Sequence, residues 1–381
     1  MTNVRIFSRF EEMPEEAARV FSAAASQSFF LGLPWFRTFA NYALDAGDEV
    51  RIYSAFAPDA GNSLDLAIPA LHKSRDSRFL RPRKLTSLTS YYSCFYSPIC
   101  AGALSRQSAM SLVNTMARES PRWDQIELKP LDVNSEVFQL LLESFRNAGF
   151  VVQTYFCFGN WYLDVKGRDF SQYLDSLPSV LRNTLNRKKK KLEKSARSKI
   201  EIITGDDGLE PAIEAYNKIY SSSWKQEEPY PQFVPELIRT CARAGALRLG
   251  VLSVDGEPAA AQFWMVHNKN ALIYKLAYDS RFADLSVGTI LTAALMEHAM
   301  DVDRVSEVDY LSGDDAYKRD WMSGRRERWG ILAMNPRTLL GALAIARHVG
   351  GRAIKRSLQA ISKRIWKPGM FHKTADSSAS L

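Results

Sequence analysis

Residues 246–278 carry the pattern that most constrains the fold of this chain. Three apolar runs of strand length, at 246–254, 259–266 and 271–278, are separated by two short turn segments. The turns read Asp255-Gly256-Glu257-Pro258 and His267-Asn268-Lys269-Asn270. Strands joined by connections this tight pair with their neighbours in opposite directions. The stretch therefore predicts a three-stranded antiparallel meander.

The segments around the meander alternate between helix and strand. After it, a loop at 279–287 precedes a helix at 288–301, a strand at 305–311, a short helix at 314–322 and a strand at 328–334. Before it, residues 170–194 are strongly helical. The first half alternates in a similar way and ends in strands at 151–158 and 161–165, around a Gly159-Asn160 turn. We predict a mixed α/β fold, in which two segments of similar size suggest a duplication.

The length of 381 residues allows two domains of ordinary size. We predict an N-terminal domain at residues 1–168, a catalytic domain at 169–335 and a basic tail at 336–381. The first residues lack the pattern of a secretory signal, and no window is apolar enough to span a membrane. The four cysteines and five histidines are scattered, which favours reduced thiols and no metal site. These features predict a cytoplasmic protein.

The tail holds the whole excess of positive charge. The net charge is +8, and residues 335–381 contain nine Lys or Arg and one acid, so the remainder of the chain is balanced. Apolar residues recur at three- and four-residue spacing between Leu340 and Ile365, and Trp366 follows. This pattern is typical of a helix that lies on an anionic membrane surface. We predict such a partner for residues 337–366; the alternative is a helix docked on the body with its basic face toward solvent.

Two segments of the catalytic half could support chemistry. A helix opens at Ser286-Val287-Gly288-Thr289, and free amides at a helix start suit a phosphate, although an ordinary helix cap has the same sequence. The second segment is Gly313-Asp314-Asp315-Ala316-Tyr317-Lys318, with Trp321 after it. Amine acylation needs a proton acceptor and a donor for the developing oxyanion, which an aspartate and Lys318 could supply. The alternative is a helix cap with a surface ion pair.

These segments resemble the acetyltransferase domain of the CelD-like and FemAB-like proteins of the GNAT superfamily. The motifs that carry the resemblance occur in the same order between residues 170 and 321. They are 181–187 (LRNTLNR), Ser223-Trp224-Lys225, 255–261 (DGEPAAA), Tyr278-Asp279, 286–288 (SVG) and the Gly313–Trp321 segment. The resemblance implies two GNAT-like folds in tandem, each a mixed, largely antiparallel sheet flanked by helices.

The resemblance also implies roles for residues. Asp314 or Asp315 would be the acid/base group, and Lys318 would lie near the reacting carbonyl. Acyl-CoA, as a co-substrate and not a permanently bound cofactor, would contact Tyr278, Ser286, Val287, Gly288 and Thr289. Further substrate contacts are predicted for Trp224, Gln262, Tyr274, Asp279, Tyr317 and Trp321. The glycine-rich phosphate signature of typical GNAT enzymes is reduced here to Gly288, and relatives in the FemAB group use aminoacyl-tRNA.

Two other segments have two interpretations each. The run Arg187-Lys188-Lys189-Lys190-Lys191 is either a solvated helix face or a phosphate-binding surface, and it lacks the flanking aromatics that would favour nucleic acid. The aromatic run Tyr91-Tyr92-Ser93-Cys94-Phe95-Tyr96 either packs in the core, which we favour, or lines a cleft. Nucleic acid is therefore not the expected partner.

The functional prediction is transfer of an acyl group, acetyl or fatty, from acyl-CoA to an amine. The basic tail favours an amine on an envelope precursor, such as an amino sugar, a polysaccharide intermediate or a long-chain amino alcohol. The alternatives are a FemAB-type transferase that uses aminoacyl-tRNA and a non-catalytic accessory of exopolysaccharide synthesis. Direct attack is expected, because no Cys or Ser lies beside a suitable His in the sequence.

Overall fold

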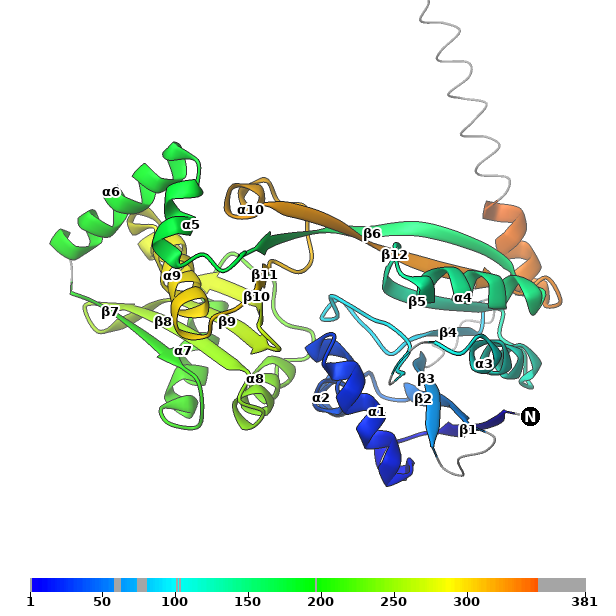
Figure 1. Cartoon of the computed structure of the whole chain (residues 1–381). Coiled ribbons are helices and arrows are strands. Elements are labelled where there is room, and N and C mark those ends of the chain that lie inside the picture. Colours follow the sequence, from blue (N-terminus) through cyan, green and yellow to red (C-terminus); the bar gives the residue numbers. More distant parts are fainter. Residues whose placement is uncertain are drawn as a thin grey trace, which may run out of the picture.

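The computed structural model describes residues 2–57, 63–73, 81–100, 102, 104–195 and 197–348 (Figure 1). The first half contains β1 (Asn3–Phe7), α1 (Glu15–Ala25), α2 (Leu33–Tyr42), β2 (Glu49–Phe56), β3 (Leu64–His72), β4 (Lys84–Ser87), α3 (Arg106–Arg118), β5 (Gln125–Asp132), α4 (Glu136–Asn147) and β6 (Val151–Asp164). Helices α5 (Phe170–Ser176) and α6 (Ser179–Ser195) follow.

The second half repeats this order of elements. It contains β7 (Ser198–Ile203), α7 (Leu209–Ser221), α8 (Phe233–Arg243), β8 (Leu247–Val254), β9 (Glu257–His267), β10 (Asn270–Tyr278), the 3-10 segment η3 (Ser280–Leu285), α9 (Val287–Glu297), β11 (Glu307–Asp309), α10 (Ala316–Trp321) and β12 (Gly324–Met334). The predicted meander is confirmed as β8, β9 and β10, which pair antiparallel. The predicted fold class is confirmed as well.

The described strands form one sheet in the order β1-β2-β3-β4-β5-β12-β6-β11-β10-β9-β8-β7. The two halves exchange their last strands. Strand β12 of the second half lies between β5 and β6, and the end of β6 pairs with β11 of the second half. Figure 1 shows these long strands running side by side from one half to the other. The predicted division at residue 168 stays a prediction, since β12 lies within the N-terminal half of the sheet.

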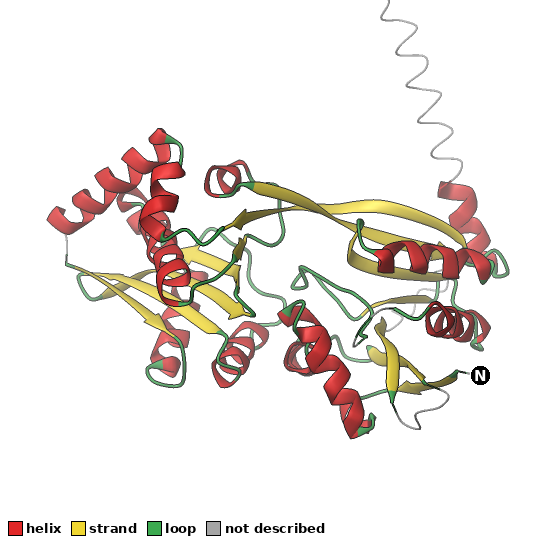
Figure 2. Ribbon diagram, viewed as in Figure 1, coloured by secondary structure: helices red, strands yellow, loops and turns green. Residues whose placement is uncertain are grey.

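Helices cover both faces of the sheet (Figure 2). The buried side chains form three clusters. One cluster lies under α3 and α4, and another under α5, α6 and α9. The third takes side chains from α1 and α2 of the first half and from α7 and α8 of the second. The edge-to-face pairs that Trp35 makes with Phe233 and Tyr274 join the halves there, and each such pair contributes about 0.5–1.5 kcal/mol beyond burial.

Two local predictions are wrong. The Gly159-Asn160 turn does not form, because β6 runs through it without interruption; Asn160 is buried and hydrogen bonded, and a Cβ at Gly159 would overlap the Asp314 carboxylate. The single helix at 170–194 is divided into α5 and α6 at Pro178, whose ring disfavours helical backbone in the preceding residue.

Candidate active site

The candidate site lies where β10 and β11 separate. These strands pair in parallel only from Asn270/Glu307 to Leu272/Asp309, and a bulge then interrupts β10 between Ile273 and Lys275. Beyond the last pair, β10 no longer pairs with the chain that follows β11. The residues of these two segments line two neighbouring pockets instead. We call them the apolar arm, of about 270 Å³, and the polar arm, of about 390 Å³. Trp224, Lys225, Leu276, Tyr310 and Tyr317 line both.

The apolar arm runs between β10 and the start of α9. Its predicted lining residues are Trp224, Gln262, Tyr278, Gly288, Thr289, Tyr317 and Trp321. Trp224, which is 61% exposed, contacts Tyr278 with the two rings tilted by 48° and their centroids 4.5 Å apart. The ring of Tyr317 meets Tyr310 edge to face at 5.8 Å. Aromatic walls of this kind accept an apolar chain and exclude water from it.

Gln262 of β9 and Gly288 of α9 hold the start of α9 beside the apolar arm. Gln262 is buried and donates to the carbonyl of Gly288 and the hydroxyl of Thr292, both at 2.8 Å, which fixes α9 to β9. A Cβ at Gly288 would lie 3.2 Å from the Tyr278 ring. Ser286 has a left-handed backbone (φ 55°) and makes no side-chain cap, so the amides of the first turn lack that partner. Ser286 and the buried Val287 do not line either arm.

The polar arm holds Tyr274, Asp315 and Lys318 of the predicted residues. The Lys318 side chain is buried; its ammonium donates to the carbonyl of Ser312 and lies 3.2 Å from the Asp315 carboxylate. Gly313 has a φ of 107°, and a Cβ there would lie 2.9 Å from the Lys318 ammonium. Glycine at this position therefore lets the ammonium reach the loop between β11 and α10, where it can donate to an oxyanion.

Two predicted carboxylates lie outside both arms. Asp314 is held by the Arg325 guanidinium through two hydrogen bonds of 2.8 and 2.7 Å, which lower its pKa. Asp279 is held in the same manner by Arg281, whose hydrogen bonds lower its pKa. A carboxylate engaged by an arginine is a weak proton acceptor. Of the two adjacent carboxylates, Asp315 is the one that lines the polar arm.

A cluster that the sequence did not single out completes the polar arm. Glu228 accepts hydrogen bonds from Lys275 and Tyr92, both at 2.7 Å, and from Tyr91. The two tyrosines and Cys94 come from the first half and line the cleft. The favoured interpretation of the aromatic run also holds, because Tyr92, Cys94 and Tyr96 are buried in the core. Lys225 also lines both arms. It follows Trp224 in a motif of the resemblance, which is the signal that could have found it.

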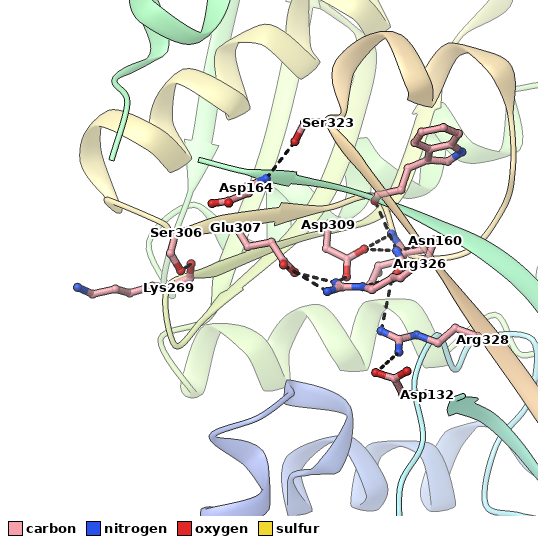
Figure 3. Close-up of polar contacts among 12 residues, drawn as sticks. Asp132, Asn160, Asp164, Lys269, Ser306, Glu307, Asp309, Ser323, Arg326 and Arg328 are labelled. Carbon is pink, nitrogen blue, oxygen red and sulfur yellow. Dashed lines mark hydrogen bonds and ion pairs between the residues drawn. The ribbon is translucent and has the colours of Figure 1, made fainter. Parts of the chain in front are cut away.

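A partly buried ionic network supports the loop between β11 and α10, the helix that carries Lys318 (Figure 3). Arg326 of β12 donates to Glu307 at 2.7 Å, to Asp309 and to the side-chain oxygen of Asn160 at 2.7 Å. Asn160 of β6 donates to Asp309 and to the carbonyl of Leu311, and the Leu311 amide donates to Asp309 at 2.6 Å. The network fixes the end of β11, from which the loop begins. Spacing along the chain could not reveal these contacts.

The second half of the chain is similar to a known enzyme domain. Residues 179–319 match the model of the acetyltransferase (GNAT) domain. This match runs from α6 into α10 and includes most of the second-half residues that line the two arms. Residues 179–319 are therefore a GNAT-type domain. No curated protein sequence matches it.

Solved structures extend the fold likeness over both halves. FemX is 11% identical, with a TM-score of 0.57 over 86% of this chain and 96% of FemX. A protein of unknown function from Bacteroides thetaiotaomicron is 12% identical, with 0.54 over 88% of this chain and all of that chain. The C-terminal DUF2156 domain of a proposed lysylphosphatidylglycerol synthetase from Agrobacterium fabrum is 13% identical. Its TM-score is 0.50 over 87% of this chain and 96% of that domain. The expected FemAB-like, tandem GNAT fold is confirmed.

Among the described residues, no group of three or more His, Cys, Asp or Glu side chains is placed to hold a metal ion. The same part of the chain contains no helix with the length and apolar character that crossing a bilayer requires.

Proposed function

We propose that this GNAT-type acyltransferase is an N-acyltransferase that takes an acyl group from acyl-CoA and transfers it to an amine of an envelope precursor. The separation of β10 from β11 carries the proposal, because it leaves a narrow, two-armed cleft beside an uncapped helix start. The Ser286 amide donates to the carbonyl of Ala283, so the donor's phosphates would meet the amides of Val287, Gly288 and Thr289, and its pantetheine and acyl chain would occupy the apolar arm. The amine would enter through the polar arm.

The residues of the cleft support direct transfer. The thioester carbonyl would lie near Lys318, whose ammonium stabilises negative charge on the oxygen. Cys94 is the thiol of the polar arm, but burial raises its pKa to about 11. A thiol that stays protonated at neutral pH is a weak nucleophile. The acyl group would therefore pass from sulfur to nitrogen without an enzyme-bound intermediate.

The acyl-CoA donor can be tested by measuring the release of free CoA. The purified protein is incubated with acyl-CoAs from acetyl to palmitoyl and with amines extracted from membranes. Thr289→Trp, which places an indole in the apolar arm, should reduce kcat/KM for the longest accepted chain about tenfold or more, and that for acetyl-CoA less. Absence of CoA release with every donor would sink the proposal.

A FemAB-type transferase that uses aminoacyl-tRNA is the alternative that an observation favours. Arg187, Lys189 and Lys190 are exposed on α6, which packs against η3 and α9 beside the proposed phosphate site. This basic face could meet the phosphates of CoA or of an RNA. Activity with purified acyl-CoA that survives RNase treatment would support CoA as the donor. Transfer that requires charged tRNA would establish the alternative.

We also propose that the amine acceptor lies at a membrane surface. Residues 339–348 are helical, and Leu339 and Leu343 are 76% and 56% exposed. The rest of the basic segment, from residue 349, lies outside the described residues. Sedimentation with vesicles that contain anionic lipid should deplete the full chain from solution and leave a chain ending at Thr338 behind. Equal sedimentation of both chains would show that the tail is not the membrane contact.

A further inference from the structure

Lys225 lies at the junction of the two arms, after the end of α7. Its ammonium lies 5.7 Å from the ring centroid of Tyr220 and 6.0 Å from that of Trp224. The Lys225 ammonium makes no hydrogen bond or ion pair with another described residue, whereas the ammonium groups of Lys275 and Lys318 do. Lys275 pairs with Glu228, and Lys318 pairs with Asp315. Of the lysines that line the cleft, Lys225 is the one without a carboxylate partner in the described part of the chain.

The groups that face Lys225 disfavour its charged form. The cations are Lys275 on β10 and Lys318 on α10, and the carboxylates Glu228 and Asp315 are each engaged by one of them. The other titratable groups lining the arms or lying near the ammonium are Tyr91, Tyr92, Cys94, Tyr220, Tyr274, Tyr278, Tyr310 and Tyr317. Burial, and then repulsion from Lys275 and Lys318, lowers the pKa of Lys225 to about 8. Near pH 7 roughly a tenth of such a lysine is neutral.

We propose that Lys225 is the catalytic base of the transfer. This inference rests on the proposed function. The amine nitrogen attacks the thioester carbon and forms the C–N bond, and the neutral Lys225 amine accepts a proton from that nitrogen. Collapse of the tetrahedral intermediate breaks the C–S bond, and the Lys225 ammonium returns the proton to the departing CoA sulfur. The products are the amide and CoA thiol, and Lys225 ends neutral, as it began.

The position explains why a lysine suits this role better than the nearby carboxylates. A base is most effective when its pKa lies near the working pH. Asp315 is held by the Lys318 ammonium, and Glu228 by Lys275 and two tyrosine hydroxyls. Lys225 also borders the apolar arm, where the thioester is proposed to lie, and the polar arm, through which the amine would arrive.

The test compares kcat/KM of the wild type and Lys225→Ala from pH 6 to 10, with acetyl-CoA and D-glucosamine. The amine of the acceptor titrates identically for both proteins, so it cancels in their ratio. The ratio should reach about 10²- to 10⁴-fold on the alkaline side and fall below pH 8. Lys225→Arg should behave like Lys225→Ala, whereas exposed Lys218→Ala should match the wild type. A ratio independent of pH would overturn the assignment. So would a loss of the alkaline activity in Asp315→Asn instead of Lys225→Ala.

A second measurement does not depend on turnover or on the variant's folding. Trace acetic anhydride labels the native wild type across the same pH range, and peptide mass spectrometry gives the labelling of each lysine. Labelling of Lys225 should rise through a midpoint near pH 8, before that of Lys218. A Lys225 midpoint at the ordinary lysine pKa would overturn the assignment. Failure of the proposed function would differ from this result, because the wild type would release no CoA.

Discussion

The two halves of the molecule share an order of elements but differ in the region beyond their parallel strand pair. Each half pairs two strands in parallel, β4 with β5 and β10 with β11. In the first half, Ser87 and Thr89 continue from β4 and hydrogen bond to the backbone of Lys129, with Ser87 donating to its carbonyl at 2.7 Å. In the second half, the bulge in β10 leaves the corresponding region open as the cleft. One half is closed by side chains, and the other is open to a substrate.

The loop after β4 shows what the closed half contributes. It passes over to the second half, where Tyr91 and Tyr92, which line the polar arm, donate to Glu228. The carbonyl of Tyr92 accepts a hydrogen bond from Tyr274 on β10 at 3.0 Å. The first half therefore supplies a wall of the cleft and pairs with β12, while the proposed chemistry lies in the second half.

The largest expected effect concerns the network that joins the halves. Arg326→Ala leaves the buried Asp309 and the half-buried Glu307 without their cation, which should reduce the free energy of unfolding by about 3–5 kcal/mol. Urea denaturation measures this change. The neighbouring Arg325→Ala removes only exposed ion pairs and should cost about 0.2–1 kcal/mol. Equal losses for the two variants would show that the halves do not depend on the network.

The next effect tests whether chemistry is confined to the open half. Lys318→Ala removes the ammonium from the loop after β11 and should lower kcat about 10²- to 10³-fold in the CoA-release assay. The matched control is Lys84→Ala on β4, which removes a partner of Glu127 and should leave kcat unchanged. A loss of turnover in the Lys84 variant would assign a catalytic contribution to the first half.

A stability measurement should reveal the cost of burying the charged Lys225 in the open half. Lys225 has its pKa lowered from 10.5 to about 8, so the folded state binds fewer protons than the unfolded state between these values. Its penalty is therefore complete below pH 8 and disappears as the pH rises toward 10.5. Lys225→Met should raise the free energy of unfolding at pH 7 by at most about 3 kcal/mol, and the gain should shrink with pH. Exposed Lys218→Met should change it by less than about 0.5 kcal/mol. A destabilised Lys225→Met at pH 7 would contradict the assignment.

The smallest effect concerns α6, which packs against η3 and α9 of the open half. Replacing Lys189 and Lys190 by alanine should raise KM for acyl-CoA a few-fold at low salt, with kcat retained, because exposed charges attract the phosphates at long range. The difference from the wild type should vanish near 1 M salt. A KM that stays unchanged at low salt would return α6 to the interpretation of a solvated helix face.

Part of the site could be predicted from the sequence because it is local. The turns around Gly256 and Asn268 define the meander, and Gly313 with Lys318 marks the loop after β11. The predictions failed where a local signal was overridden by a distant contact. Gly159 suggested a turn, but it lies in a strand that Asp314 approaches; Asp314 suggested a base, but Arg325 on β12 holds it.

The sequence by itself therefore determined the order of elements in the second half, the meander, the helix start at Ser286–Thr289 and the Gly313–Trp321 segment that carries Lys318. Periodicity and turn chemistry act over a few residues, so they can be read along the chain. Only the tertiary structure decided the exchange of β12, the entry of Tyr91 and Tyr92 into the cleft, and the lowered pKa of Lys225. Each of these depends on contacts between residues distant in the chain, and burial and charge act through space.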